Sequence, residues 1–201
     1  GVDAVVGTNV YSKGNLQVVT PTGENGNTFS TIGVSSGKWY AEFYLEASTG
    51  AMRATVAVSS DPELTRQSNY NIGHLSGARD VGYMGNDGEK FVNNSESSYG
   101  TAFSNGDIIG CALDVDNDTV NFNNNGGSWK GTISIASTII GAWHIGCGDV
   151  SGGYGETIVA NFGQDSSFAG GKTAQGNQDS NDIGDFYYTP PSGFLALCTS
   201  N

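Results

Sequence analysis

The chain has 201 residues, with 20 Asp and Glu against 8 Lys and Arg, which gives a formal net charge of −12. A chain this acidic repels phosphate backbones, so the composition argues against a nucleic-acid partner. No apolar run approaches the ~20 residues of a membrane span, so no membrane insertion is expected. Thirty-one glycines and only four prolines favour many short strands joined by tight turns, and the length suits one all-β domain covering residues 1–201.

Segments at 2–6, 16–19 and 28–34 are the first strand candidates, and Gly and Asn turns separate them. The strongest early strand is 36–46, SGKWYAEFYLE, in which side chains alternate with a period of two. That period is typical of a strand with one packed face. The packed face carries Trp39, Ala41, Phe43 and Leu45. The other face, expected to meet solvent or a partner, carries Lys38, Tyr40, Glu42, Tyr44 and Glu46.

The next elements are a strand at 52–59 and a long polar connection at 61–80. Twenty residues are too many for a simple connection in a compact domain, so this segment is a candidate functional loop. A hairpin is predicted from 81–84 and 89–92, joined by Asn86-Asp87-Gly88. The Asp-Gly pair supplies the positive φ that such a turn needs.

A second hairpin is predicted over 107–123, where alternating apolar residues surround the polar turn 116–118. Its apolar face carries Ile109, Cys111, Leu113, Val115, Val120 and Phe122. Strand candidates follow at 133–139, 143–147 and 158–162, and the chain then loses all periodicity from 163 to 185, which predicts a surface excursion. Strand-like character resumes at 186–188 and 194–197. Cys111 and Cys147 alternate with apolar residues, so both are predicted to be core thiols.

This succession of motifs resembles the SPRY domain, a concanavalin-like β-sandwich. The matching stretches are SGKWYAEFYLE at 36–46, VGYMGNDGEKFVN at 81–93 and NGDIIGCALDVDNDTVNFNNNGG at 105–127. The last resembles the family's glycine-aspartate hairpin and its asparagine-glycine turn. The ending, NFGQDSSF at 161–168 and FYYTPPSGFLALCTS at 186–200, is similar to the version found in bacteriophage and marine viral proteins.

The resemblance implies two packed antiparallel sheets whose loops at one end bind a partner. It implies no catalytic residue. It also suggests a domain or processed piece of a larger virion protein, at a virion surface or in an extracellular setting. The expected partners are other virion proteins, in a homo-oligomer or an assembly, and host surface proteins or glycans.

Aromatic and amide side chains in the loops are the candidate ligand contacts, because an aromatic ring stacks on apolar C–H groups while amides bind polar groups. An alternative is that these tyrosines cover the ends of the core. The candidate ligand-binding residues are Tyr70, Asn71, Arg79, Asn94, Tyr99 and Tyr154.

Two other kinds of site are weighed on the residues present. Asp114, Asp116 and Asp118 alternate as in an EF-hand loop, and hard oxygen ligands suit calcium. However, Thr119 and Asn125 stand where that loop requires Gly and Glu, so a structural turn is the favoured interpretation and no cofactor is expected. His74 and His144 are the only histidines and neither lies in a nucleophile motif, so the chain is predicted not to be an enzyme.

The leading functional hypothesis is therefore a virion-surface module, in capsid decoration or beside a tail fibre, that adheres to host or environmental molecules such as glycans. A second hypothesis is architectural: the domain cements or caps a repeated assembly, with Tyr40, Tyr44 or 163–185 buried between subunits. A third is an intracellular SPRY adaptor that grips a short peptide.

Overall fold

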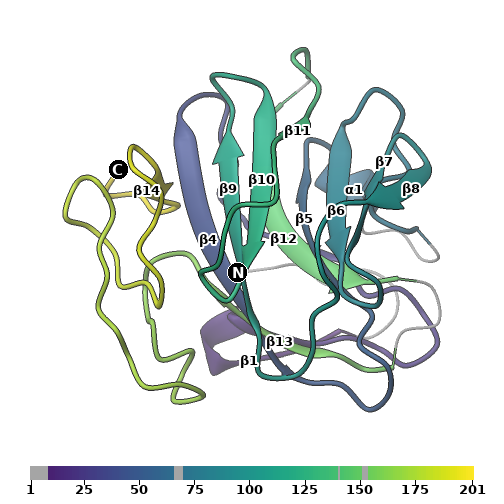
Figure 1. Cartoon of the computed structure of the whole chain (residues 1–201), viewed down its shortest axis with the longest axis horizontal. Coiled ribbons are helices and arrows are strands. Elements are labelled where there is room, and N and C mark those ends of the chain that lie inside the picture. The colour runs from purple at the N-terminus through teal and green to yellow at the C-terminus, as the bar shows by residue number, and fades with distance from the viewer. Residues whose placement is uncertain (1–8, 66–69, 140, 151–153) are drawn as a thin grey trace.

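The computed structural model describes residues 9–65, 70–139, 141–150 and 154–201, so the strand predicted at 2–6 lies outside it. Two sheets face each other as a β-sandwich, which confirms the predicted fold class (Figure 1). Helix in the described ranges amounts to α1 (Pro62–Thr65) and a 3-10 turn at Lys13–Asn15. Neither is long or apolar enough to cross a membrane.

The larger sheet has eight strands among the described residues, in the order β1-β2-β13-β4-β9-β10-β11, with β14 beside β4. All pairs are antiparallel except β14 with β4. The strands are β1 (Val10–Ser12), β2 (Gln17–Val19), β13 (Thr157–Asn161), β4 (Lys38–Ala47), β9 (Ile108–Asp114), β10 (Thr119–Asn124), β11 (Ile133–Ser134) and β14 (Leu195–Ala196).

The smaller sheet has six strands in the same described ranges, in the order β3-β12-β5-β6-β7-β8. All of its pairs are antiparallel. The strands are β3 (Thr28–Phe29), β12 (His144–Asp149), β5 (Ala54–Ser59), β6 (Asp80–Met84), β7 (Glu89–Val92) and β8 (Ser95–Ser98).

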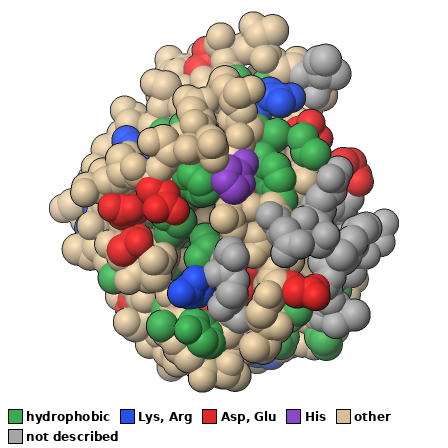
Figure 2. All heavy atoms as spheres, turned by 90° about the vertical axis from the view of Figure 1, so that its right-hand side faces the viewer, with side chains coloured by type: hydrophobic (Ala, Val, Ile, Leu, Met, Phe, Trp, Pro, Cys, Tyr) green, Lys and Arg blue, Asp and Glu red, His purple; other side chains and the backbone are tan. Residues whose placement is uncertain are grey.

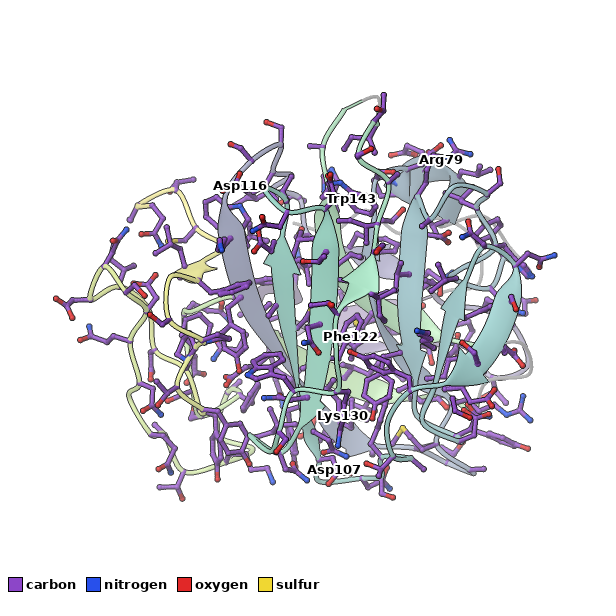
Figure 3. All side chains as sticks on the ribbon, turned by 45° about the horizontal axis from the view of Figure 1, so that its top comes forward. Arg79, Asp107, Asp116, Phe122, Lys130 and Trp143 are labelled. Atoms are coloured by element: carbon purple, nitrogen blue, oxygen red, sulfur yellow. The ribbon has the colours of Figure 1, made fainter. Side chains whose placement is uncertain are left out.

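The core between the sheets is built by the predicted alternation. In the β9–β10 hairpin Leu113 pairs with Val120 and Cys111 with Phe122, so all four side chains enter the core from one face. Cys111 and Cys147 are buried free thiols, as predicted, and burial raises the pKa of each thiol well above its usual value. Labelled Phe122 lies in the middle of the sandwich in Figure 3.

Glycine is required at two positions by close backbone geometry. Gly88 has a φ of +78° in the β6–β7 turn, which confirms the predicted role of Asp87-Gly88. At Gly146 an added Cβ would lie 2.1 Å from the Thr28 carbonyl oxygen, so only glycine lets β3 approach β12.

The outer face of the larger sheet is covered by residues 163–201, here called the C-terminal segment (yellow in Figure 1). The predicted exposure of Tyr40 and Glu42 is therefore wrong, because both side chains are fully buried. Tyr40 packs edge-on against Phe186, with ring centroids 5.0 Å apart, and Tyr44 packs against Phe168 at 5.5 Å. Alternation separates the two faces of a strand, but it does not reveal that the same chain returns to cover the second face.

Glu42 holds the C-terminal segment to β4. Its carboxylate accepts hydrogen bonds from the backbone N–H groups of Tyr187 (2.9 Å) and Tyr188 (2.8 Å). It also accepts from the Tyr40 hydroxyl at 3.1 Å and from the Asn161 amide at 3.2 Å. Burial raises the pKa of Glu42 to about 7, and these donors oppose that rise by stabilising the carboxylate.

The outer face of the smaller sheet is covered in a similar way by the 61–79 loop. Ile72 is buried there against Phe29 and Ala57. The Asp80 carboxylate, at the start of β6, accepts backbone hydrogen bonds from Gly73 (2.6 Å) and Leu75 (2.8 Å). Burial raises the pKa of Asp80, and the two backbone donors counteract part of that rise.

Three predicted strands are much shorter than expected. Only Thr28–Phe29 of 28–34 and Ile133–Ser134 of 133–139 are strands, and Phe186 of 186–188 makes one isolated bridge to Asn177. These segments lie at sheet edges or on the outer face, where side-chain packing fixes the backbone without a continuous ladder.

Candidate functional site

The two ends of the sandwich differ in what they carry. Arg79, Asp116 and Trp143 lie at one end in Figure 3, and Asp107 and Lys130 lie at the other. We call these the Arg79 end and the Asp107 end. Strand pairing agrees with this division, because His144 pairs with Ser59 and Ser59 with Asp80, which places the start of β12, the end of β5 and the start of β6 together.

A groove of about 670 Å³ opens at the Arg79 end. Its walls come from the residues after β5, the residue before β6 and the segment that leads into β12. Its lining mixes polar and apolar side chains, including Asp61, Pro62, Arg79, Thr138, Ile139 and His144. The groove therefore offers both hydrogen-bond partners and apolar contacts to a bound segment.

Arg79 is the cationic group of the groove. Its Nε donates to the Ser76 carbonyl at 3.3 Å, and its terminal nitrogen lies 3.8 Å from an Asp61 carboxylate oxygen. Asp61 also caps α1, accepting from the Leu64 N–H at 3.3 Å. An exposed ion pair of this length contributes little to stability, so the guanidinium is open to an incoming carbonyl or carboxylate.

His144 and Ser60 are both engaged by the backbone. His144 Nδ1 lies 2.7 Å from the Ser30 carbonyl oxygen, which only accepts, so Nδ1 carries the proton. The Ser60 hydroxyl donates to the Arg79 carbonyl at 3.0 Å. The serine proton is therefore directed to a peptide group and not to the imidazole, which is not the arrangement of an activated nucleophile.

Four of the six predicted ligand residues belong to one system of loops. Arg79 lines the groove itself, and Asn94 lies in the β7–β8 turn, where its N–H donates to the Gly73 carbonyl at 2.8 Å. Tyr70 and Asn71 lie in the part of the 61–79 loop that packs on the smaller sheet. There the Asn25 amide donates to Asn71 at 2.8 Å, and burial raises the pKa of Tyr70.

The structure does not bring Tyr99 and Tyr154 to this groove. Tyr99 lies beside β10, where its hydroxyl contacts Gly131, next to Lys130. Tyr154 pairs with Thr22, and the Arg53 guanidinium lies 5.5 Å from its ring, near the opposite end of β5 from Arg79. Both tyrosines thus cover edges or ends of the core, which is the alternative weighed for these residues.

Two of the three carboxylates proposed for calcium, Asp114 and Asp116, have protein partners. Asp114 receives the Asn117 amide at 2.8 Å and the Lys38 ammonium at 3.0 Å. Although partial burial opposes it, these groups hold the pKa of Asp114 below its usual value. Asp116 accepts the Gly37 N–H at 2.7 Å. In the described ranges, no three His, Cys, Asp or Glu side chains are grouped so that they could share a metal ion.

The second histidine packs among aromatic side chains. His74 lies with its ring centroid 4.8 Å from Phe91 and 5.5 Å from Tyr70. Figure 2 shows the side of the molecule that carries β7 and β8, where hydrophobic side chains lie among polar ones. These contacts give His74 a packing role in the 61–79 loop.

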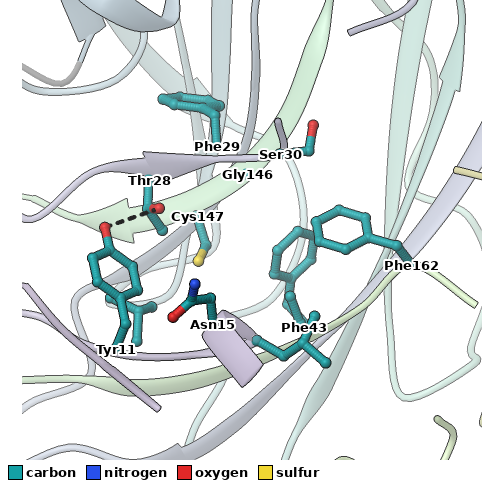
Figure 4. A pocket seen from close by; sticks show the side chains of 12 residues that line it. Tyr11, Asn15, Thr28, Phe29, Ser30, Phe43, Gly146, Cys147 and Phe162 are labelled. Atoms are coloured by element: carbon teal, nitrogen blue, oxygen red, sulfur yellow. Dashed lines mark hydrogen bonds between the residues drawn. The ribbon is translucent and has the colours of Figure 1, made fainter. Parts of the chain in front are cut away.

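A smaller pocket lies between the sheets, where β2 and β3 approach each other (Figure 4). It is lined by side chains such as Tyr11, Phe43, Cys147 and Phe162, and the Tyr11 hydroxyl donates to Thr28 at 3.2 Å. Its volume of about 30 Å³ is enough for water but not for a ligand. It is therefore too small to serve as a binding site.

Sequence reasoning identified one groove residue as a ligand contact, Arg79, and missed Pro62, Ile139 and His144 in that role. The signal that could have found them is positional. Each lies close to the end of a predicted strand: Pro62 follows 52–59, Ile139 ends 133–139 and His144 is near the start of 143–147. Such strand ends gather at one end of a sandwich. Which junctions meet depends on strand order, which local periodicity does not reveal.

Three comparisons with known proteins bear on identity. The model of the SPRY domain family matches residues 18–165. The SPRY domain of human HERC1 superposes with a TM-score of 0.60 at 21% identity, covering 76% of this chain and 91% of that chain. A second human SPRY domain gives a TM-score of 0.57 at 17% identity, covering 80% and 96%.

Among curated proteins, the chain is 28% identical over 199 residues to the ATP-dependent RNA helicase Ddx1 of Drosophila melanogaster. The match covers 94% of this chain but only 23% of the helicase. The two structural likenesses show the same sandwich, and the family model covers well over half of the chain in the order of its strands. The chain belongs to the SPRY domain family.

Proposed function

We propose that the chain is a non-enzymatic recognition module that binds a segment of a protein partner in the groove at the Arg79 end. Family membership supports this, because SPRY domains are generally protein-interaction modules. The observation that carries the proposal is the groove itself, in which a loosely paired guanidinium stands beside Pro62 and Ile139. An arginine beside apolar side chains is a frequent combination at binding hot spots.

The groove is expected to bind an extended peptide that places a carboxylate or carbonyl on Arg79 and an apolar side chain beside Ile139. The groove holds an exposed cation in a chain of net charge −12, so an acidic group of the partner would gain most at this position. Truncating either groove residue should weaken the same ligand.

Peptide display against the whole chain, followed by affinity measurement, tests the proposal. Enriched peptides should bind Arg79→Ala and Ile139→Ala about tenfold or more weakly than the unchanged chain. Lys130→Ala, a charge deletion at the Asp107 end, serves as the matched control and should not change affinity. Enriched peptides that bind all three variants equally would place recognition elsewhere.

A finer proposal concerns setting: the chain acts at the surface of a virion, as capsid decoration or beside a tail fibre, and adheres to host surface molecules such as glycans. Its support is the resemblance of 161–168 and 186–200 to bacteriophage and marine viral versions, together with the acidic composition. A glycan array and a pull-down from host cells would test it, and absence of binding in both would count against it. The alternatives stay the cementing role and the intracellular adaptor. Burial of Tyr40 by the chain itself removes one reason for a subunit interface at that face.

A further inference from the structure

A second groove, of about 340 Å³, lies on the outer face of the larger sheet. Its floor is formed by outward-facing residues of β9 and β10, among them Ala112 and Asn121. One wall is Trp129, from the connection after β10, and the other is Pro191 and Phe194, from the C-terminal segment. It is therefore built jointly by the family-matched region 18–165 and by a segment outside that match.

The aromatic walls are held in place by packing. The Trp129 ring meets Tyr40 edge-on, with centroids 6.3 Å apart, and Tyr40 is fully buried against Phe186. The Lys38 ammonium lies 5.9 Å from the Phe194 ring centroid. Rings fixed in this way lose little conformational freedom when a ligand packs between them.

The acceptor atoms fixed on the groove are already used. Asn121 Oδ1 accepts from the Tyr99 hydroxyl at 2.9 Å and from the Gly131 N–H at 3.2 Å. The two Asp114 oxygens accept from Asn117, and one of them also pairs with Lys38. By contrast, no described residue accepts a hydrogen bond from the Trp129 indole N–H, the Asn121 amide nitrogen or the hydroxyls of Thr119 and Thr132. The groove thus offers more donors than acceptors, because only the two hydroxyls can also accept.

Aromatic walls with a surplus of donors match the chemistry of one kind of chain. A polyproline II helix has unpaired carbonyl oxygens, and its prolines have no N–H to satisfy. An extended strand would bring N–H donors and a sugar would bring several hydroxyl donors, whereas the acceptors left at this groove are the two threonine hydroxyls. We propose that the groove between Trp129 and Phe194 binds a proline-rich segment of another protein in the polyproline II conformation.

The chain already packs proline against this surface. Pro190 is buried, and Pro191 is itself a wall of the groove. The adjoining Tyr188 packs close to Gly126, where an added Cβ would lie 2.3 Å from its ring. A proline-rich partner would extend this packing across the groove to Trp129, which is the mode by which aromatic grooves bind such segments.

Calorimetric titration of the whole chain with decaproline and with a set of Pro-x-x-Pro peptides tests the proposal. At least one should bind, and Trp129→Ala should weaken it about tenfold or more. Trp129→Phe, which keeps a ring but removes the indole N–H, should show a smaller loss. If Trp129→Ala lowers the melting temperature, its loss of affinity could come from unfolding. Phe194→Ala, on the opposite wall, then provides the test.

Two controls separate this groove from the first. Trp39→Phe alters a tryptophan on the opposite face of β4, whose indole N–H donates to Ser36, and should leave affinity unchanged. Arg79→Ala should leave it unchanged as well, whether or not the groove at the Arg79 end proves functional. The proposal is overturned if no proline-rich peptide binds, or if Trp129→Ala and Phe194→Ala both bind normally. Titration with cellohexaose supplies a further outcome: binding of this sugar that Trp129→Ala abolishes would assign the groove to glycans instead.

Discussion

At the residue scale, Tyr99 closes the part of β10 that lies beyond its short pairing with β11. Its hydroxyl accepts from the Phe122 N–H at 3.0 Å and contacts Asn121 and the Gly131 carbonyl. Its ring packs on Tyr83 and Phe122. One side chain thus satisfies backbone groups that a longer neighbouring strand would otherwise pair.

Replacing this hydroxyl should be costly. Tyr99→Phe leaves the Phe122 N–H and the Gly131 carbonyl without this partner, so the free energy of unfolding should fall by about 1–2 kcal/mol. Urea denaturation measures the change. Tyr187→Phe is the matched control, because no described residue hydrogen-bonds to the Tyr187 hydroxyl. Equal effects in the two variants would show that the Tyr99 hydroxyl has no special role.

The contacts of the carboxylates at 114–118 lead to a prediction about calcium binding. Asp114 and Asp116 already accept from Asn117, Lys38 and the Gly37 N–H, so calcium would have to displace these donors. We therefore expect the same melting temperature in excess calcium and in EDTA. A rise with calcium that Asp116→Asn abolishes would establish a calcium site at this turn.

At the scale of elements, both outer faces of the sandwich are covered by irregular segments that buried carboxylates hold in place. Glu42 holds the C-terminal segment and Asp80 holds the 61–79 loop, each through two backbone N–H groups. Neither carboxylate forms an ion pair with a described cation. The hydrogen bonds of these carboxylates stabilise the fold, but burial of their negative charge is unfavourable. Protonation removes that charge, so these contacts are sensitive to pH.

The Glu42 contact sets a pH dependence for the chain. The pKa of Glu42 is about 7 in the folded chain, and its ordinary value, taken for the unfolded chain, is 4.5. The folded state therefore binds a proton at Glu42 more tightly than the unfolded state does. Stability from this group is fully present below pH 4.5 and is lost as the pH rises to about 7. The unfolding free energy of the unchanged chain minus that of Glu42→Gln should therefore be more positive at pH 5 than at pH 8. Denaturant titration at the two pH values checks it. A difference that does not change with pH would contradict this prediction. Asp149, whose pKa is also raised, chiefly by burial, is present in both chains, so its effect cancels in the difference.

The elements also show what sequence can and cannot predict. The β9–β10 hairpin and its apolar face were predictable, because Leu113, Cys111, Val120 and Phe122 alternate without interruption. The cover over Tyr40 and Tyr44 was not, because the C-terminal segment is held by single contacts, Phe186 on Tyr40 and Phe168 on Tyr44, which leave no periodic trace. Among the site residues, Arg79 was predictable as a loop cation. Its neighbours Ile139 and His144 were not, because they reach the groove only through the pairing of β12 with β5.

At the scale of the whole molecule, the family match and the folded unit differ in extent. The family model ends at residue 165, yet the next residues bury Ile108, Ala112 and Val159 on the outer face of the larger sheet. The C-terminal segment is therefore part of the stability of this chain, and it also supplies a wall of the Trp129 groove.

Removal of residues 166–201 tests that dependence. The truncated chain should melt at a markedly lower temperature and expose an apolar face that promotes self-association, because Tyr40 and Ala112 lose their cover. Scanning calorimetry and light scattering measure the two effects. A truncated chain with an unchanged melting temperature that stays monomeric would show that the segment is dispensable for folding.

The most direct test of the account is a map of backbone amide shifts when the labelled chain binds a peptide enriched by display. The groove at the Arg79 end predicts shifts concentrated around Asp61, Arg79, Ile139 and His144, with Asp107 and Lys130 unaffected. Shifts concentrated at the Asp107 end, around Tyr154 and Lys130, would contradict it.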